Sequence, residues 1–174
     1  FKKMENATGV PNDTKYRGHD GPLYLEKGPA KNPLFKAFFD AAVAAGFKRT
    51  DDVNGFRQEG FGPFDKNVKN GRRWSSSTAY LHPVMNRKNL TIQTRHQVHR
   101  VIFEGDKAVG VVAQRGKTIT EYRAKNVVLC GGAINTPQVL QLSGIGPAEL
   151  LKRHGIPVVK DLPGVGQNLQ DHLE

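Results

Sequence analysis

Up to residue 88, the spacing of apolar and polar residues is typical of loops and helices. Beyond residue 88, the spacing typical of β-strands dominates. Gly, Pro, Asn and Asp recur through 1–31, which predicts loops interrupted by one short strand at Leu23–Leu25. A helix is then predicted from Asn32, its cap, with Pro33 in the first turn and Gly46 after the end. Apolar residues recur along it at helical spacing, so we expect one face in the core: Leu34, Phe35, Phe38, Ala42 and Ala45.

Residues 51–65 are rich in turn-forming residues and aromatics. Two interpretations of the aromatic residues stay open: they fill the core of a loop-rich layer, or they line a pocket. The residues concerned are Phe56, Phe61, Phe64 and Trp74. Residues 71–83 predict a serine-capped short helix through Leu81 that ends at Pro83.

Strands are predicted at 90–94, 98–103, 108–113 and 118–123. The last three are joined by short turns, which indicates an antiparallel meander. Further along, the pattern predicts a short helix at 147–153, which Gly155 closes, and a strand at 156–159.

The stretch from Asn126 to Cys130 is a short apolar run rich in β-branched residues, which predicts a strand buried on both faces of a central sheet. Gly131 and Gly132 follow, and Thr136-Pro137 predicts the start of a helix over 138–142. A strand, a glycine turn and a helix start together direct free N–H groups towards an anion, here a nucleotide phosphate. A tight turn of purely structural importance is the alternative.

The 174 residues carry a formal charge of +10, with 26 Lys and Arg against 16 Asp and Glu. The densest basic patch comprises Lys66, Lys69, Arg72 and Arg73 beside Trp74. One hypothesis is a module that binds an anionic polymer. The basic residues are otherwise dispersed, which favours solvated faces and no nucleic-acid partner.

The only cysteine, Cys130, excludes an internal disulfide, and its apolar neighbours predict a small buried side chain. The six histidines are scattered, so we expect no metal site. No apolar run is long enough to cross a bilayer.

Residues 132–146, GAINTPQVLQLSGIG, resemble the second signature of the glucose-methanol-choline (GMC) oxidoreductases, with small residues, Thr-Pro, two aliphatics and Ser-Gly-Ile-Gly. Within that family, residues 21–28, 32–65, 71–83 and 161–174 resemble the choline dehydrogenases. The resemblance implies an α/β fold of mixed α+β character: part of a Rossmann-like FAD-binding domain with an antiparallel meander, and part of a substrate domain. It divides the chain into a connector (1–14), a substrate-domain part (15–88) and an FAD-domain part (89–174).

The resemblance also implies a cofactor, FAD, with Val98, Gly131, Gly132 and Ala133 as its contacts. Choline would be oxidised to betaine aldehyde, its hydride would pass to flavin N5, and the electrons would pass to an acceptor of the respiratory chain. Animal members are mitochondrial, and membrane association of a full-length protein is compatible with this role. A different alcohol is the alternative substrate; for a quaternary ammonium, Phe61, Phe64 and Trp74 are candidate aromatic faces.

Two departures from the family pattern stand out. No GxGxxG follows a strand near the start, so the main pyrophosphate-binding turn is missing. None of the six histidines matches the catalytic histidine, which we expect beyond Glu174. His172, next to Asp171, is expected to be structural. We therefore expect an internal fragment without catalytic residues, inactive alone and weak in FAD binding.

Overall fold

A computed structural model describes residues 1–10 and 15–171. They divide into two compact units, Phe1–Thr91 and Ile92–Glu174. The division lies close to the boundary predicted between 88 and 89, whereas the assignment of the units to a substrate domain and an FAD domain stays a prediction. Each unit contains helices and small sheets, which confirms the mixed α/β class.

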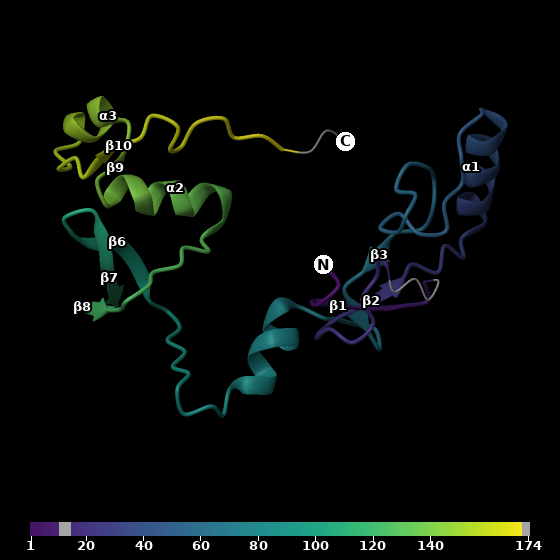
Figure 1. Ribbon diagram of the computed structural model, residues 1–174, viewed down its shortest axis with the longest axis horizontal. Coiled ribbons are helices and arrows are strands. Elements are labelled where there is room, and N and C mark those ends of the chain that lie inside the picture. The colour runs from purple at the N-terminus through teal and green to yellow at the C-terminus, as the bar shows by residue number, and fades with distance from the viewer. Residues whose placement is uncertain (11–14, 172–174) are drawn as a thin grey trace. The chain divides into compact units, whose positions relative to one another are not determined.

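The first unit is built on a sheet in the order β1-β2-β3 (Figure 1). Strand β1 (Glu5–Thr8) runs parallel to β2 (Leu23–Lys27), and β3 (Asp65–Lys66) is antiparallel to β2. The predicted strand at 23–25 is thus confirmed, and β1 is a strand inside the predicted connector. The remaining elements of the unit are α1 (Pro33–Ala44), β4 (Val68–Lys69), β5 (Arg72–Arg73), a π-helical turn η1 (Ser77–Leu81) and a 3-10 turn η2 (His82–Val84).

Helix α1 begins and ends where the sequence predicts. The Asn32 side chain accepts a hydrogen bond from the Leu34 N–H at 2.9 Å, and Pro33 occupies the first turn. Gly46, with φ of +89°, leaves the helix in the left-handed region that favours glycine.

Replacing Asn32 with Ala is expected to destabilise the protein by about 1 kcal/mol, because the Leu34 N–H loses its only side-chain acceptor. Thermal unfolding would measure the loss. Asn32→Ser is the matched control: it retains a capping oxygen and should stay within a few tenths of a kcal/mol of the native protein. Equal losses in both variants would show that the cap does not stabilise α1.

The apolar face of α1 is only partly buried, so the expectation of a core face was wrong for four of the five residues. Ala42 is buried, as is its neighbour Phe39, whereas Ala45 is exposed, and Leu34, Phe35 and Phe38 are 75%, 49% and 56% exposed. Helical spacing shows which residues share a face, but burial also requires a partner layer. In the described part of this unit, Phe39 and Ala42 are the buried residues of α1.

Two prolines lie differently from prediction. Pro83 does not end the helical turns, because η2 continues through it as a 3-10 turn. Helix α2 (Gly132–Leu142) begins before Thr136 and contains Pro137 in its interior. Thr136 is therefore not the N-cap of a helix that begins at Pro137. Its Oγ1 instead accepts a hydrogen bond from the Gly131 N–H at 3.0 Å.

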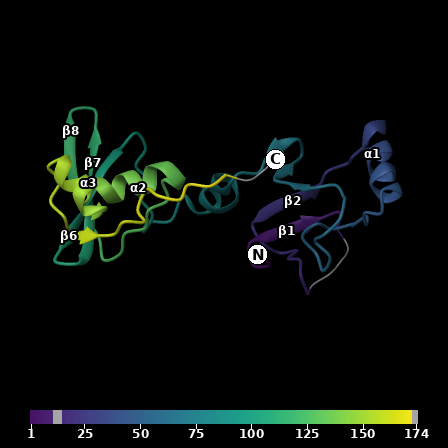
Figure 2. The same ribbon diagram turned by 90° about the horizontal axis from the view of Figure 1, so that it is seen from above.

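The second unit contains the predicted meander, which is confirmed: β6 (Gln97–Glu104), β7 (Lys107–Arg115) and β8 (Thr118–Arg123) are antiparallel neighbours. Helix α2 lies across this sheet (Figure 1), as the view from above also shows (Figure 2). The short helix α3 (Ala148–Arg153) confirms the prediction for 147–153. The strands predicted at 90–94 and 156–159 are wrong; a short parallel pair, β9 (Ile145–Gly146) and β10 (Lys160–Asp161), forms nearby.

Residues 126–130 do not form the predicted strand and lie outside any sheet of the described residues. Val128 is 81% exposed, and Cys130 is exposed where a buried side chain was expected. An apolar strand of this kind needs neighbours on both edges, and none of the described strands pairs with it. These residues therefore give no structural support to a cofactor bound beside a strand of a central sheet.

Candidate functional site

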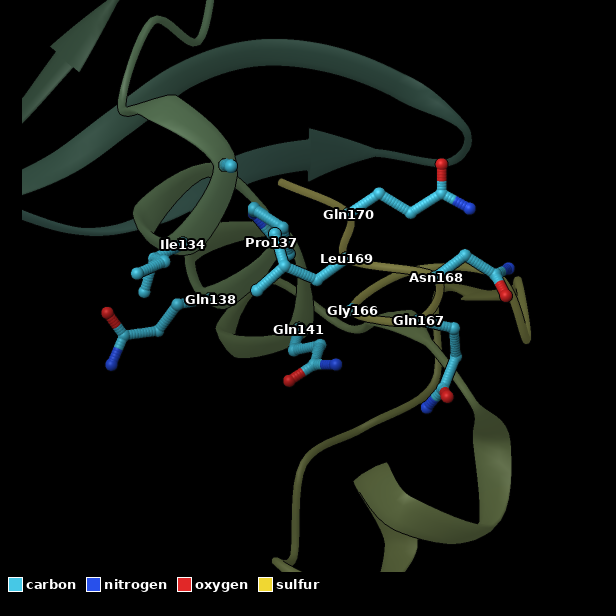
Figure 3. A pocket seen from close by; sticks show the side chains of 10 residues that line it. Ile134, Pro137, Gln138, Gln141, Gly166, Gln167, Asn168, Leu169 and Gln170 are labelled. Carbon is cyan, nitrogen blue, oxygen red and sulfur yellow. The ribbon is translucent and has the colours of Figure 1, made fainter. Parts of the chain in front are cut away.

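A cavity of about 590 Å³ lies between α2 and the segment Gly166–Gln170 (Figure 3). Both walls belong to the second unit. From α2 the cavity is lined by Ala133, Ile134, Pro137, Gln138 and Gln141; from the facing segment it is lined by Gly166, Gln167, Asn168, Leu169 and Gln170. Its volume is in the range of ligand pockets.

The helical wall is fixed to the meander by Ser143, the residue after α2. Its Oγ accepts a hydrogen bond from the buried Val101 N–H at 2.8 Å and donates one to the Val139 carbonyl at 2.5 Å. A buried N–H without a partner would cost free energy, so this bond sets where the end of α2 rests on β6. The bond from β6 to Ser143 therefore fixes the helical wall of the cavity relative to the sheet.

The predicted cofactor residues at the glycine turn lie at the opening of α2. Ala133 lines the cavity, and Gly131 and Gly132 directly precede it. Gly132 has φ of +81°, and no atom lies within 4 Å of where its Cβ would stand. The first turn of α2 carries no acidic residue that would oppose an anion at the positive end of the helix. This open glycine turn beside a cavity fits a nucleotide cofactor.

Val98, the fourth predicted contact, lies on β6 opposite Ala113, next to a β-bulge. It is partly buried and does not line the cavity. The role of all four residues as cofactor contacts stays a prediction. His172 lies outside the described residues.

Sequence reasoning missed the amides that line the cavity, which are Gln138, Gln141, Gln167, Asn168 and Gln170. Glutamine has no special spacing that marks a site, so only their positions within residues 132–146 and 161–174 hinted at them. Their side chains offer donors and acceptors of the kind that orient a polar ligand.

A second cavity, of about 730 Å³, lies in the first unit against α1 and is mostly apolar. Phe61 and Phe64 line it together with Phe35, Phe38 and Phe39. The pocket interpretation is thus supported for these two aromatics. Phe56 lines a different cavity, of about 340 Å³, and contacts Tyr16 at 5.7 Å between ring centroids. Trp74 does not line the apolar cavity, so these residues do not form one aromatic box.

Two lysines of the basic patch contact side chains of the protein itself. Lys66 pairs with Glu26 at 3.1 Å. The Lys69 ammonium lies over the rings of Tyr24 and Trp74, at 5.0 and 4.8 Å from their centroids. The Trp74 ring is therefore held by a lysine of its own chain, which weakens the hypothesis of a surface for anionic polymers.

Arg17 forms a buried ion cluster that the sequence did not reveal. Its side chain is 1% exposed and bonds to Glu5 at 3.1 Å, Asp52 at 2.5 Å and Asp65 at 2.7 Å. Burial alone would lower the pKa of Arg17, but hydrogen bonds from the guanidinium to the three carboxylates raise it above its ordinary value. The cluster joins β1, β3 and the loop at Asp52 into one layer.

Within residues 1–10 and 15–171, no three His, Cys, Asp or Glu side chains are placed to hold a metal ion. The same residues contain no helix with the length and apolar character that crossing a bilayer requires.

Comparisons with known proteins agree with the resemblance. The family described as GMC oxidoreductase matches residues 1–174. The chain is similar to oxygen-dependent choline dehydrogenases of Staphylococcus aureus and Staphylococcus haemolyticus, 58% identical to each over its whole length. It spans 31% of the length of these curated relatives.

Solved structures give the same picture. An FAD-dependent oxidoreductase from Chaetomium thermophilum matches 98% of this chain with a TM-score of 0.89 and 32% identity, over 32% of its own chain. Pyridoxine 4-oxidase from Mesorbium loti matches 94% with a TM-score of 0.86 and 32% identity, also over 32% of its own chain. The curated relatives are bacterial, so they give no support to the mitochondrial location that the resemblance implied.

Proposed function

The chain belongs to the GMC oxidoreductase family, and from this premise we propose that it is part of an FAD-dependent enzyme that oxidises choline to betaine aldehyde. The observation that carries the proposal is the 58% identity to curated choline dehydrogenases over all 174 residues. Because the chain spans 31% of their length, we assign the activity to a full-length protein that contains it.

In this proposal the second unit contributes one wall of the cofactor site. Gly131, Gly132 and Ala133 let the backbone approach the cofactor, and the amides of the cavity other than Gln141 orient its polar groups. FAD, when bound, supplies the acceptor for the hydride of the alcohol. The histidine that removes the hydroxyl proton is proposed to lie outside these residues, as is the main pyrophosphate-binding turn.

The electron acceptor is a finer proposal. The family resemblance favours an acceptor of the respiratory chain, whereas the relatives are named oxygen-dependent. A membrane-bound acceptor is compatible with the proposal, and so is a soluble one. A test of the chemistry therefore has to be independent of the acceptor.

The full-length protein is expected to hold FAD as purified, and choline added without oxygen should bleach the flavin absorbance and yield betaine aldehyde. Bleaching reports transfer of the hydride to the cofactor, so no external acceptor is required. Pyridoxine, the substrate named for one structural relative, is the comparison alcohol and should leave the spectrum unchanged. Bleaching by pyridoxine and not by choline would overturn the substrate assignment, and purification without flavin would overturn the cofactor.

A further inference from the structure

We propose that Gln141 is a positioning residue that holds the turn at Gly166 against α2 and so fixes the second wall of the cofactor cavity. The proposal rests on the proposed function, since it concerns the same cavity. It adds a role for a side chain that need not touch the cofactor.

The first observation is a hydrogen bond between the two walls. Gln141, on α2, donates from Nε2 to the Val165 carbonyl at 3.1 Å, and the contact is partly buried. Val165 immediately precedes the segment Gly166–Gln170 that lines the cavity. This bond therefore ties the helix to the start of the facing wall.

The second observation is that glycines flank Gln141 on both sides. A Cβ at Gly166 would lie 2.6 Å from Gln141 Nε2, and a Cβ at Gly146 would lie 3.0 Å from Gln141 Cγ. Side chains at these positions would push the amide or its stem out of place. Gly166 also has φ of +82°, which favours glycine for its backbone conformation. The two glycines thus leave a slot that the Gln141 side chain fills.

The third observation concerns the path of the segment. It is first tied to β9 by the Leu162 N–H, which donates to the Gly146 carbonyl at 3.0 Å. Gln141 provides the next tie, at Val165. Beyond it, Asn168 adopts φ of +56°, an uncommon conformation for a residue with a side chain. The hydrogen bond from Gln141 therefore holds the chain at Val165, directly before the residues at which the segment turns along the cavity.

The orientation of the side chains shows what this tie controls. Leu169 points towards Pro137 of α2, whereas Gln167 and Asn168 point away from the helix (Figure 3). A segment that turned differently at Gly166 would carry Leu169 away from Pro137 and change the cavity. Gln141 thus acts on the ligand through the segment.

The decisive variant is Gln141→Glu in the full-length protein. Glutamate keeps the size of the side chain but, when ionised, cannot donate to the Val165 carbonyl and repels it. We expect the dissociation constant for FAD to rise by at least about tenfold, equivalent to about 1.4 kcal/mol. It would be measured by titrating the apoprotein with FAD and following the flavin spectrum, and the melting temperature of the apoprotein would be recorded in parallel.

Gln114→Glu is the matched control. Gln114 also donates from Nε2 to a backbone carbonyl, that of Gly116 at 2.8 Å, but in the exposed turn after β7. Because its bond is partly buried, Gln141→Glu should lower the melting temperature of the apoprotein at least as much as Gln114→Glu does, but only Gln141→Glu should weaken FAD binding. Gly166→Ala should weaken it as well, and combining it with Gln141→Glu should add little, because both act on one contact.

The outcomes separate this inference from the proposed function. If the native protein holds FAD and choline bleaches it, but Gln141→Glu binds FAD as tightly as Gln114→Glu, the positioning role is refuted and the function stands. If Gln141→Glu weakens FAD binding only as far as it destabilises the apoprotein, the effect is purely structural, and the positioning role is refuted as well. A native protein without FAD would overturn both.

Discussion

Replacing Arg17 with Met is expected to destabilise the protein by about 3–5 kcal/mol, the largest effect we predict for a single side chain. Methionine fills a similar volume without charge, so the loss is electrostatic. Glu5, Asp52 and Asp65 would keep their negative charges with the cation removed. The cost of buried charge without a partner exceeds that of a lost surface pair. Thermal or denaturant unfolding would measure the loss.

Arg123→Met is the matched control. Arg123 also contacts two carboxylates, Glu104 at 2.8 Å and Glu121 at 3.3 Å, but its side chain is 54% exposed. Exposed pairs of this kind are worth about 1 kcal/mol or less, because water and salt screen them. If both variants lose equal stability, burial of the Arg17 cluster is not what makes it important.

The pKa of Arg17 gives the sign of the pH dependence. The hydrogen bonds to the three carboxylates raise the pKa of Arg17 in the folded state above its unfolded value. A raised pKa contributes stability that is complete below the unfolded value and is lost only as the pH rises through the folded one. The contribution that comes from the protonation of Arg17 should therefore be constant across neutral pH. A fall in this contribution between pH 6 and 9 would contradict the assignment.

Local signals in the sequence predicted the local structure well. The cap and glycine stop of α1, the turns of the meander and the short helix α3 depend on neighbours within a few residues, and all three are confirmed. A sequence pattern typical of a helix start can be misleading when the capping side chain forms a different hydrogen bond. Thr136-Pro137 has the pattern of a helix start, but Thr136 bonds to Gly131 while α2 passes through.

Predictions that needed distant partners were less reliable. The apolar run at 126–130 and the exposed face of α1 show residues suited to burial, but burial depends on strands and layers that the described residues do not supply. The Arg17 cluster was missed for the related reason that its members are dispersed along the chain. At the candidate site, the glycine turn was predicted, whereas the facing wall and the link through Gln141 depend on a contact between distant residues.

The Ser-Gly-Ile-Gly part of the family signature has a structural explanation here, centred on Gly144. Its φ is +87°, and a Cβ on it would lie 2.4 Å from the Pro157 carbonyl oxygen and 2.9 Å from Val159 Cγ2. Its carbonyl accepts hydrogen bonds from Val159 at 2.8 Å and Lys160 at 3.1 Å. Gly144 therefore lets the chain after α2 press directly against the chain that leads into β10.

Gly144→Ala is accordingly expected to destabilise the protein by two separate costs. The left-handed conformation costs an alanine about 1–2 kcal/mol, and the clash with the Pro157 carbonyl adds about 1–3 kcal/mol. Gly116→Ala isolates the first cost, because Gly116 has φ of +58° but nothing within 4 Å of its Cβ position. Unfolding of both variants gives the difference. If Gly144→Ala loses no more stability than Gly116→Ala, then the signature does not require this close approach, and its glycine must be explained by conformation alone.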